Sequence, residues 1–307
     1  MNCNKQKKKL EFDHRISDLT NVHLRGIKAP SVKFHPNWES LFQFIQQEIA
    51  EELGPNLELS KGISNFLFYV FPSLTYDIAS SVLIYNMALF MLDEHLKEFP
   101  GEAKNMIQKI RNKSFTGNKN YDKLWRLSIK VCTEVMGENT FDQLLECLIH
   151  TWTKALEVHK LICSEVTLSD SKFIELRRVG SSVSHLFFLV LIGAKMQFAT
   201  GLQSDPNYLG LNKHAAIHVT LVNDLYSLRK QIRDGSVKRN YVYVKMNNGN
   251  ITAQQSVDEI IHEIDEADIM AHQHGENLKK TNDPNLCRYV DGIYDAMKGN
   301  HYWSTIG

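Results

Sequence analysis

Residues 221–231, LVNDLYSLRKQ, carry a regular polar pattern inside an otherwise apolar stretch. Asn223, Ser227 and Gln231 stand four residues apart, so they share one face if the segment is helical. Apolar residues precede the pattern and leucines interrupt it. A polar face in such surroundings is either a solvated surface or a row of oxygen ligands for a metal ion. The segment therefore predicts a helix and leaves these two roles open.

The charge balance argues against one broad class of partner. The chain has 307 residues, of which 43% are hydrophobic, and its 35 Lys+Arg balance its 35 Asp+Glu. Proteins that bind nucleic acid usually show an excess of basic residues. We therefore expect no nucleic-acid partner, and any anionic ligand must be held by a local group of cations or by metal.

Cysteine usage and hydropathy predict a cytoplasmic protein without a membrane span. The five cysteines are odd in number and form no CxxC pair, which fits reduced thiols better than a disulfide framework. The N-terminal MNCNKQKKKLEFDH lacks the apolar run of a secretory signal. No apolar stretch reaches the roughly 18 residues that a membrane span needs. The cysteines are Cys3, Cys132, Cys147, Cys163 and Cys287.

Apolar residues recur at spacings of three and four along most of the chain, which is typical of helices. The alternation in residues 241–246 is too isolated to predict a sheet. We expect an N-terminal extension, partly disordered, over residues 1–34, and a single all-α domain of about ten helices over residues 35–307. Helices are predicted at 38–52, 61–70, 75–98, 102–112, 121–136, 140–163, 170–200, 211–234, 253–280 and 284–304. Those at 75–98 and 170–200 are apolar nearly all round, which is typical of central helices in a bundle.

A second polar group ends the apolar helix predicted at 75–98. Asp93, Glu94 and Glu98 place three carboxylates within about one and a half turns. Carboxylates suit Mg²⁺, although a solvated helix end is the more ordinary explanation for such a group on its own. Further along, Arg177 and Arg178 precede a Gly-Ser stretch, and guanidinium groups are natural partners of phosphate oxygens.

Taken in order, these motifs resemble those of class I terpene synthases, the microbial type of terpene cyclase. The FxxDD motif of the family has a counterpart in FMLDE at 90–94, and its ND(L/I/V)x(S/T)xxxE motif has one in NDLYSLRKQ at 223–231. Arg177 matches the arginine that senses diphosphate. RNYV at 239–242 and GNHYWS at 299–304 resemble the segments that follow. The resemblance extends from about residue 35 to the end of the chain.

This resemblance implies a bundle around a central apolar cavity, and a Mg²⁺-dependent lyase that ionises farnesyl or geranylgeranyl diphosphate. The allylic cation left after loss of diphosphate would be cyclised to a sesquiterpene or diterpene. A homodimer is among the assemblies that the sequence allows. Three Mg²⁺ ions are implied, with Asp93 as the first ligand of the acidic motif, Glu94 and Glu98 as supporting or alternative ligands, and Asn223, Ser227 and Gln231 on the opposite wall.

The resemblance also implies roles at the diphosphate and in the cavity. Arg177 and Lys230 would contact the diphosphate, and Arg178 competes with Arg177 for the sensing role. Phe90 and Trp303 would face the carbocation, because their motifs fix them in place. The further aromatic candidates, each with core packing as the alternative role, are Phe66, Tyr69 and Phe187.

Three departures from the family pattern keep other functions open. Glu94 replaces the usual second Asp, and Gln231 replaces the usual Glu, so one metal loses the charge of a ligand. The Arg-Tyr pair that follows WS in the family has no counterpart up to Gly307, and Arg288-Tyr289 is not at that position. A weakened member that binds prenyl diphosphates without turnover is therefore an alternative. A chain-elongating prenyl synthase would need a second Asp-rich motif, and a helical scaffold would leave the polar groups unexplained.

Overall fold

A computed structural model describes residues 14–24, 27–53, 57–163, 168–196 and 202–306 of the chain, and these residues contain helices and no strand. The predicted all-α fold is confirmed. The α-helices are α1 (His14–Thr20), α2 (Trp38–Leu53), α3 (Leu57–Val70), α4 (Tyr76–Glu98), α5 (Ala103–Arg111), α6 (Asn120–Met136), α7 (Glu138–Cys163), α8 (Asp170–Gly180), α9 (Val183–Gly193), α10 (Pro206–Arg233), α11 (Tyr241–Gly249), α12 (Ala253–Lys279) and α13 (Pro284–Ile306).

The helices differ from the predicted set at two informative places. The helix predicted at 170–200 is broken into α8 and α9, where Ser182 adopts a left-handed backbone with φ of 62°. Non-glycine residues rarely adopt this conformation, which ends the helical hydrogen-bond pattern. The alternating segment at 241–246 lies in α11, which begins where the Asn240 side chain accepts a hydrogen bond from the Val242 N–H. This cap starts a helix despite the β-branched sequence.

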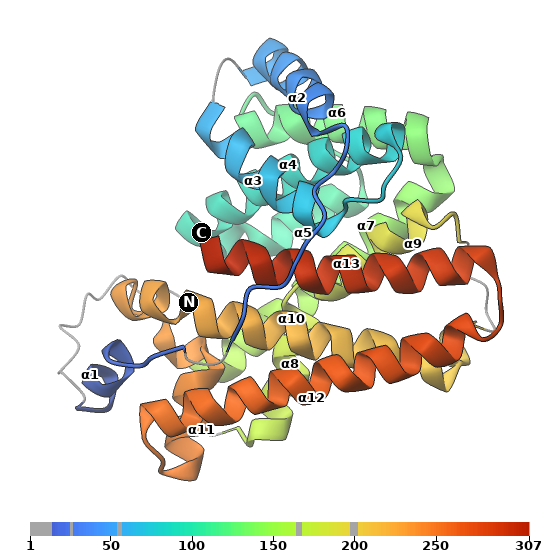
Figure 1. The fold of residues 1–307 in the computed structure, drawn as a ribbon. Coiled ribbons are helices and arrows are strands. Elements are labelled where there is room, and N and C mark those ends of the chain that lie inside the picture. Colours follow the sequence, from blue (N-terminus) through green and yellow to red (C-terminus); the bar gives the residue numbers. More distant parts are fainter. Residues whose placement is uncertain (1–13, 25–26, 54–56, 164–167, 197–201, 307) are drawn as a thin grey trace.

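Helix α13 occupies the middle of the molecule. In Figure 1 it runs, in red, between α2–α6 on one side and α10, α11 and α12 on the other. It packs against α3 and α10, while α10 packs along α12 and α4 packs on α6. The approach to α3 is close at Gly299, where a Cβ would lie 2.2 Å from the Tyr69 carbonyl oxygen. The glycine of the GNHYWS motif therefore permits two helix backbones to touch.

Two apolar clusters form the core. The larger joins α2–α7 and α9 to the first half of α10 and to α13, and includes the fully buried Trp125 and Tyr85. The smaller lies where the second half of α10 meets α11 and α12, and Leu19 of α1 is buried in it. The polar stripe of residues 223–231 is on the half of α10 that this smaller cluster supports.

Helix α10 is held at its beginning by a local cap. The Asp205 carboxylate accepts hydrogen bonds from the Asn207 and Tyr208 N–H groups at 2.7 and 3.1 Å, and Pro206 occupies the first turn. Proline fits there because that turn needs no donor from its nitrogen. The cap starts this helix upstream of the predicted residue 211.

The N-terminal segment crosses the bundle as a strap, defined here as residues 27–35. Lys33 Nζ lies 3.3 Å from the Asp295 carboxylate of α13. The His35 N–H donates to the Phe68 carbonyl at 3.2 Å, and His35 Nε2 lies 2.9 Å from the Leu74 carbonyl oxygen. Residues 1–13 and 25–26 of the predicted extension lie outside the described residues, so its partial disorder and the boundary at residue 35 stay predictions.

Within the described ranges, no single helix is long and apolar enough to cross a membrane. The bent pair α8 and α9 meets the test of length and composition only when its two helices are taken together.

Candidate active site

The polar stripe of α10 divides into an accessible position and two half-buried ones. Asn223 is exposed, whereas Ser227 and Gln231 are half-buried beneath it along the helix. Between them, Asp224 is completely buried. The predicted shared face is therefore present, and a carboxylate without a role predicted from the sequence lies directly beside it.

Asp224 connects the stripe to α8. Its carboxylate forms an ion pair with the Arg177 guanidinium, through Nη2 and through Nε at 3.4 Å, and accepts a hydrogen bond from the Tyr241 N–H at 3.0 Å. Burial lowers the pKa of Arg177, but the charge and hydrogen bonds of Asp224 outweigh this effect, so its pKa is raised and the side chain stays cationic. The structure thus brings the predicted diphosphate sensor to the α10 stripe.

Asn240 connects the stripe to α11. Its Nδ2 donates to the Asp224 carbonyl oxygen at 2.6 Å and to Gln231 Oε1 at 3.0 Å. Gln231 Nε2 in turn donates to Ser227 Oγ at 3.0 Å. Asn240 is fully buried, and it has no role predicted from the sequence although it lies within the RNYV segment. Its relation to Gln231 depends on the turn between α10 and α11, which the spacing does not reveal.

Three of the predicted aromatic residues meet across helices. The ring of Phe66 in α3 lies 6.4 Å from that of Phe90 in α4 and 6.1 Å from that of Trp303 in α13, in both cases edge to face. All three are half-buried rather than enclosed in the core. Tyr69 instead packs on Phe34 and Tyr302, and Phe187 is buried in α9.

The acidic motif lies in the last turns of α4, where Asp93 is exposed. The backbones of Glu94 and Glu98 belong to the same helix, but their side chains lie outside the described part of the chain. Lys230 is exposed on α10, and Arg178 is half-buried in α8. These positions stay predictions as metal or diphosphate contacts.

The donor atoms of the α10 stripe fit Mg²⁺ in part. Asn223 and Ser227 offer an amide and a hydroxyl oxygen, which are hard ligands of the kind that Mg²⁺ takes. Gln231 offers its nitrogen toward Ser227, because its oxygen accepts from Asn240. Among the described side chains, no three of His, Cys, Asp or Glu are grouped as a metal site. The α10 side would therefore hold the ion mainly through neutral oxygens.

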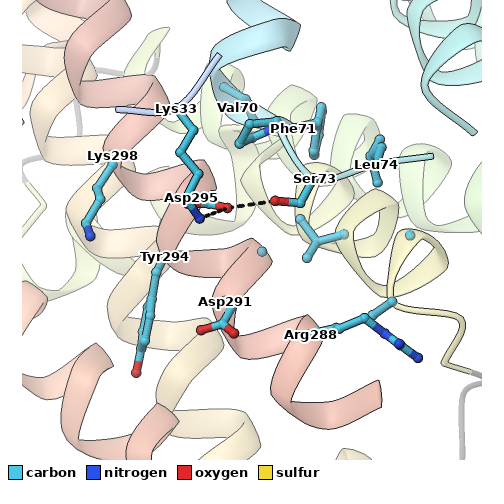
Figure 2. A pocket seen from close by; sticks show the side chains of 15 residues that line it. Lys33, Val70, Phe71, Ser73, Leu74, Arg288, Asp291, Tyr294, Asp295 and Lys298 are labelled. Carbon is cyan, nitrogen blue, oxygen red and sulfur yellow. Dashed lines mark hydrogen bonds and ion pairs between the residues drawn. The ribbon is translucent and has the colours of Figure 1, made fainter. Parts of the chain in front are cut away.

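A separate cleft of about 420 Å³ lies between the strap, the segment before α4, the end of α9 and the first half of α13. Figure 2 shows Lys33 and Ser73 both reaching Asp295 within it. The cleft adjoins the start of α4, whereas Asp93 lies 17 residues beyond Tyr76, or about 25 Å along the helix. None of the residues that line the cleft belongs to α10, so the cleft is distinct from the α10 stripe.

Curated relatives match part of the chain. Aristolochene synthase of Aspergillus terreus is 25% identical over 134 residues, which cover 37% of this chain and 40% of that protein. Terpene synthase 6 of Dictyostelium discoideum is 24% identical over 140 residues, which cover 44% of this chain and 39% of that protein. The chain thus spans about two fifths of the length of these relatives in each match.

Solved structures match nearly the whole chain. The 2-methylisoborneol synthase of Streptomyces coelicolor A3(2), solved with Mg²⁺ and 2-fluoroneryl diphosphate, has a TM-score of 0.78 at 14% identity, covering 92% of this chain and 95% of that one. Linalool/nerolidol synthase of Streptomyces clavuligerus has a TM-score of 0.73 at 13% identity, covering 91% and 99%. These likenesses show a shared fold.

The sequence itself identifies the family. The family model described as terpene synthase family 2, C-terminal metal binding, matches residues 85–267, more than half of the chain. This range includes the acidic motif, Arg177, the α10 stripe and Asn240. The chain belongs to the terpene synthase family.

Proposed function

We propose that the protein is a Mg²⁺-dependent terpene cyclase that releases diphosphate from a prenyl diphosphate and cyclises the allylic cation that remains. The observation that carries the proposal is the Arg177–Asp224 ion pair, which ties the arginine predicted to bind diphosphate to the oxygen-bearing stripe of α10. The names of the relatives are consistent with it, and one structural neighbour contains both Mg²⁺ and a diphosphate compound.

The polar side chains would bind the leaving group and its metals. Asp93, with Glu94 and Glu98, would hold Mg²⁺ from α4, while Asn223 and Ser227 would hold it from α10. When bound, Mg²⁺ neutralises the negative charge that develops on the departing diphosphate. Arg177 and Lys230 would donate hydrogen bonds to the same oxygens, and charge-assisted bonds of this kind strengthen as the bond to carbon breaks.

The aromatic side chains would protect and guide the cation. Phe90, Phe66 and Trp303 present ring faces and edges near one another. A ring face stabilises a cation by about 0.5–2 kcal/mol, and an apolar lining excludes the water that would quench it. We propose farnesyl or geranylgeranyl diphosphate as substrate, three Mg²⁺ ions as cofactors and the cytoplasm as location; a homodimer stays a prediction.

The decisive test is to incubate the purified protein with Mg²⁺ and either farnesyl or geranylgeranyl diphosphate, and to identify products by gas chromatography–mass spectrometry. Cyclic terpenes are the expected result. Asp93→Asn should lower turnover by on the order of tenfold or more, because it removes a ligand charge from the metal. Asp77→Asn, at the other end of α4, is the matched control. Equal kinetics for all three proteins would place the acidic motif away from the chemistry.

The second candidate function is prenyl-diphosphate binding without turnover. The observation that favours it is Gln231, which lacks the charge of the usual Glu and directs its oxygen to Asn240. Tight Mg²⁺-dependent binding of the substrates without product would establish this function. Product formation would eliminate it.

A further inference from the structure

The orientation of the Asn240 side chain is fixed by three hydrogen bonds. Its Oδ1 accepts from the Val242 N–H at 2.9 Å, and its Nδ2 donates to the Asp224 carbonyl at 2.6 Å and to Gln231 Oε1 at 3.0 Å. Exchanging the oxygen and nitrogen would set a donor against the Val242 N–H and an acceptor against the Asp224 carbonyl. Because Asn240 is fully buried, water does not compensate for such a mismatch.

The fixed Asn240 determines how Gln231 is turned. The amide group of Asn240 presents N–H toward Gln231, so the acceptor Oε1 of Gln231 must face it. The Nε2 group of Gln231 then faces Ser227, to which it donates at 3.0 Å. The side of Gln231 next to the α10 metal ligands consequently carries hydrogen atoms and partial positive charge.

A carboxylate at residue 231 would behave differently. Glutamate has two equivalent oxygens, so one could accept from Asn240 while the other bound a cation. Glutamine has a single oxygen, and Asn240 uses it. Glutamine at residue 231, in place of the family's glutamate, therefore removes a charge and also turns an N–H group, instead of an oxygen, toward the cation.

We infer that Gln231 is not a metal ligand in this protein; this inference rests on the proposed function. Gln231 is instead an N–H donor that positions Ser227. Asn240 is the positioning residue that holds Gln231 in this orientation. The α10 metal is held from this helix by Asn223 and Ser227 alone. Two neutral oxygens bind Mg²⁺ more weakly than a set that includes a carboxylate. Half-saturation of the protein with Mg²⁺ therefore requires a higher concentration than it would with Glu at position 231.

The direct test is a crystal structure of the protein with Mg²⁺ and inorganic diphosphate. We expect every atom of Gln231 to lie beyond about 3 Å from the nearest cation, since Mg²⁺–oxygen bonds are about 2.0–2.1 Å long. In the same complex of Gln231→Glu, a carboxylate oxygen is expected at bonding distance. A bond between Gln231 Oε1 and Mg²⁺ in the wild-type complex would overturn the inference.

Calorimetric titration of Mg²⁺ in the presence of inorganic diphosphate gives a second readout. Gln231→Glu should lower the half-saturating Mg²⁺ concentration by about tenfold, as expected when a charged ligand is gained at close range. Gln203→Glu, which adds the same charge before the start of α10, should leave it unchanged. An unchanged value for Gln231→Glu would place residue 231 away from the cation and overturn the inference that its donor orientation weakens Mg²⁺ binding, while leaving the proposed function intact. Absence of Mg²⁺-dependent diphosphate binding in every variant would instead refute the proposed function itself.

Discussion

At the scale of single residues, the Arg177–Asp224 ion pair contributes to stability and also positions the arginine that we propose binds diphosphate. Asp224 is fully buried and Arg177 retains 21% side-chain exposure, so the pair is shielded from water on one side and accessible on the other. Arg177→Gln leaves the Asp224 charge buried with the Tyr241 N–H as its remaining partner. We expect the free energy of unfolding to fall by about 2–4 kcal/mol, measured by urea denaturation.

An exposed ion pair on the same helix α8 provides the control for this prediction. Lys172 Nζ lies 3.0 Å from the Glu175 carboxylate on α8, and both side chains are more than half exposed. Lys172→Gln should change stability by less than about 1 kcal/mol, because water solvates the remaining charge. Similar losses for the two variants would show that burial does not determine the strength of the Arg177 pair.

At the scale of elements, the contact between α13 and α3 depends on a missing side chain. A Cβ on Gly299 would lie 2.2 Å from the Tyr69 carbonyl oxygen and 2.8 Å from the Val70 nitrogen, and these backbone atoms cannot rotate away. Gly299→Ala should therefore separate the helices and cost about 1–3 kcal/mol of stability. Gly62→Ala, in α3 with nothing within 4 Å of its Cβ position, should instead stabilise by up to about 1 kcal/mol. Thermal unfolding of both variants tests this prediction: the melting temperature should fall for Gly299→Ala and rise for Gly62→Ala.

Elements also show where sequence reasoning succeeds and where it stops. Periodic spacing located most helices, because a buried helix face repeats every three to four residues. It merged α8 with α9, because the apolar spacing continues past the Gly-Ser stretch at 180–182, where Ser182 takes a left-handed backbone and the helix breaks. It gave no sign of α11 either: the Asn240 cap that starts this helix depends on local geometry rather than on the alternating pattern.

The candidate site, like the helices, could be predicted from the sequence only in part. Spacing placed Asn223, Ser227 and Gln231 on one face, because helix geometry converts spacing into direction. The resemblance to the family, and not spacing, implied that Phe90 and Trp303 face a common cavity. Neither of them revealed that Asp224 would pair with Arg177, 47 residues away, or that Asn240 would orient Gln231. Both contacts form between helices whose relative placement is decided by packing across the whole bundle.

At the scale of the whole molecule, buried histidines make stability depend on pH. Burial lowers the pKa of His185 and of His218 to about 3, and neither ring nitrogen of His185 has a hydrogen-bond partner among the described residues. The unfolded chain binds these protons near pH 6.5, so stability is full above that pH and falls as pH decreases toward 3. Each histidine contributes a slope of about 1.4 kcal/mol per pH unit within this window.

His185→Leu should therefore reduce the loss of stability between pH 6 and pH 4 by about 1.4 kcal/mol per pH unit. Urea denaturation at several pH values measures this slope. His262→Leu, at an exposed position of α12, should leave the slope as in the wild type. Parallel curves for wild type and His185→Leu would show that the buried imidazole is already protonated in the folded protein.

The strap has a consequence for how the protein is made. Lys33 pairs with Asp295, 262 residues later in the chain. Ribosomes add roughly 5–20 residues per second, so the strap waits on the order of 15–50 s before its partner on α13 has been synthesised. During that interval Asp295 has not been synthesised, so the nascent bundle lacks the Lys33–Asp295 ion pair. The strap, which precedes α2–α13 in the chain, is thus among the last segments to complete its contacts.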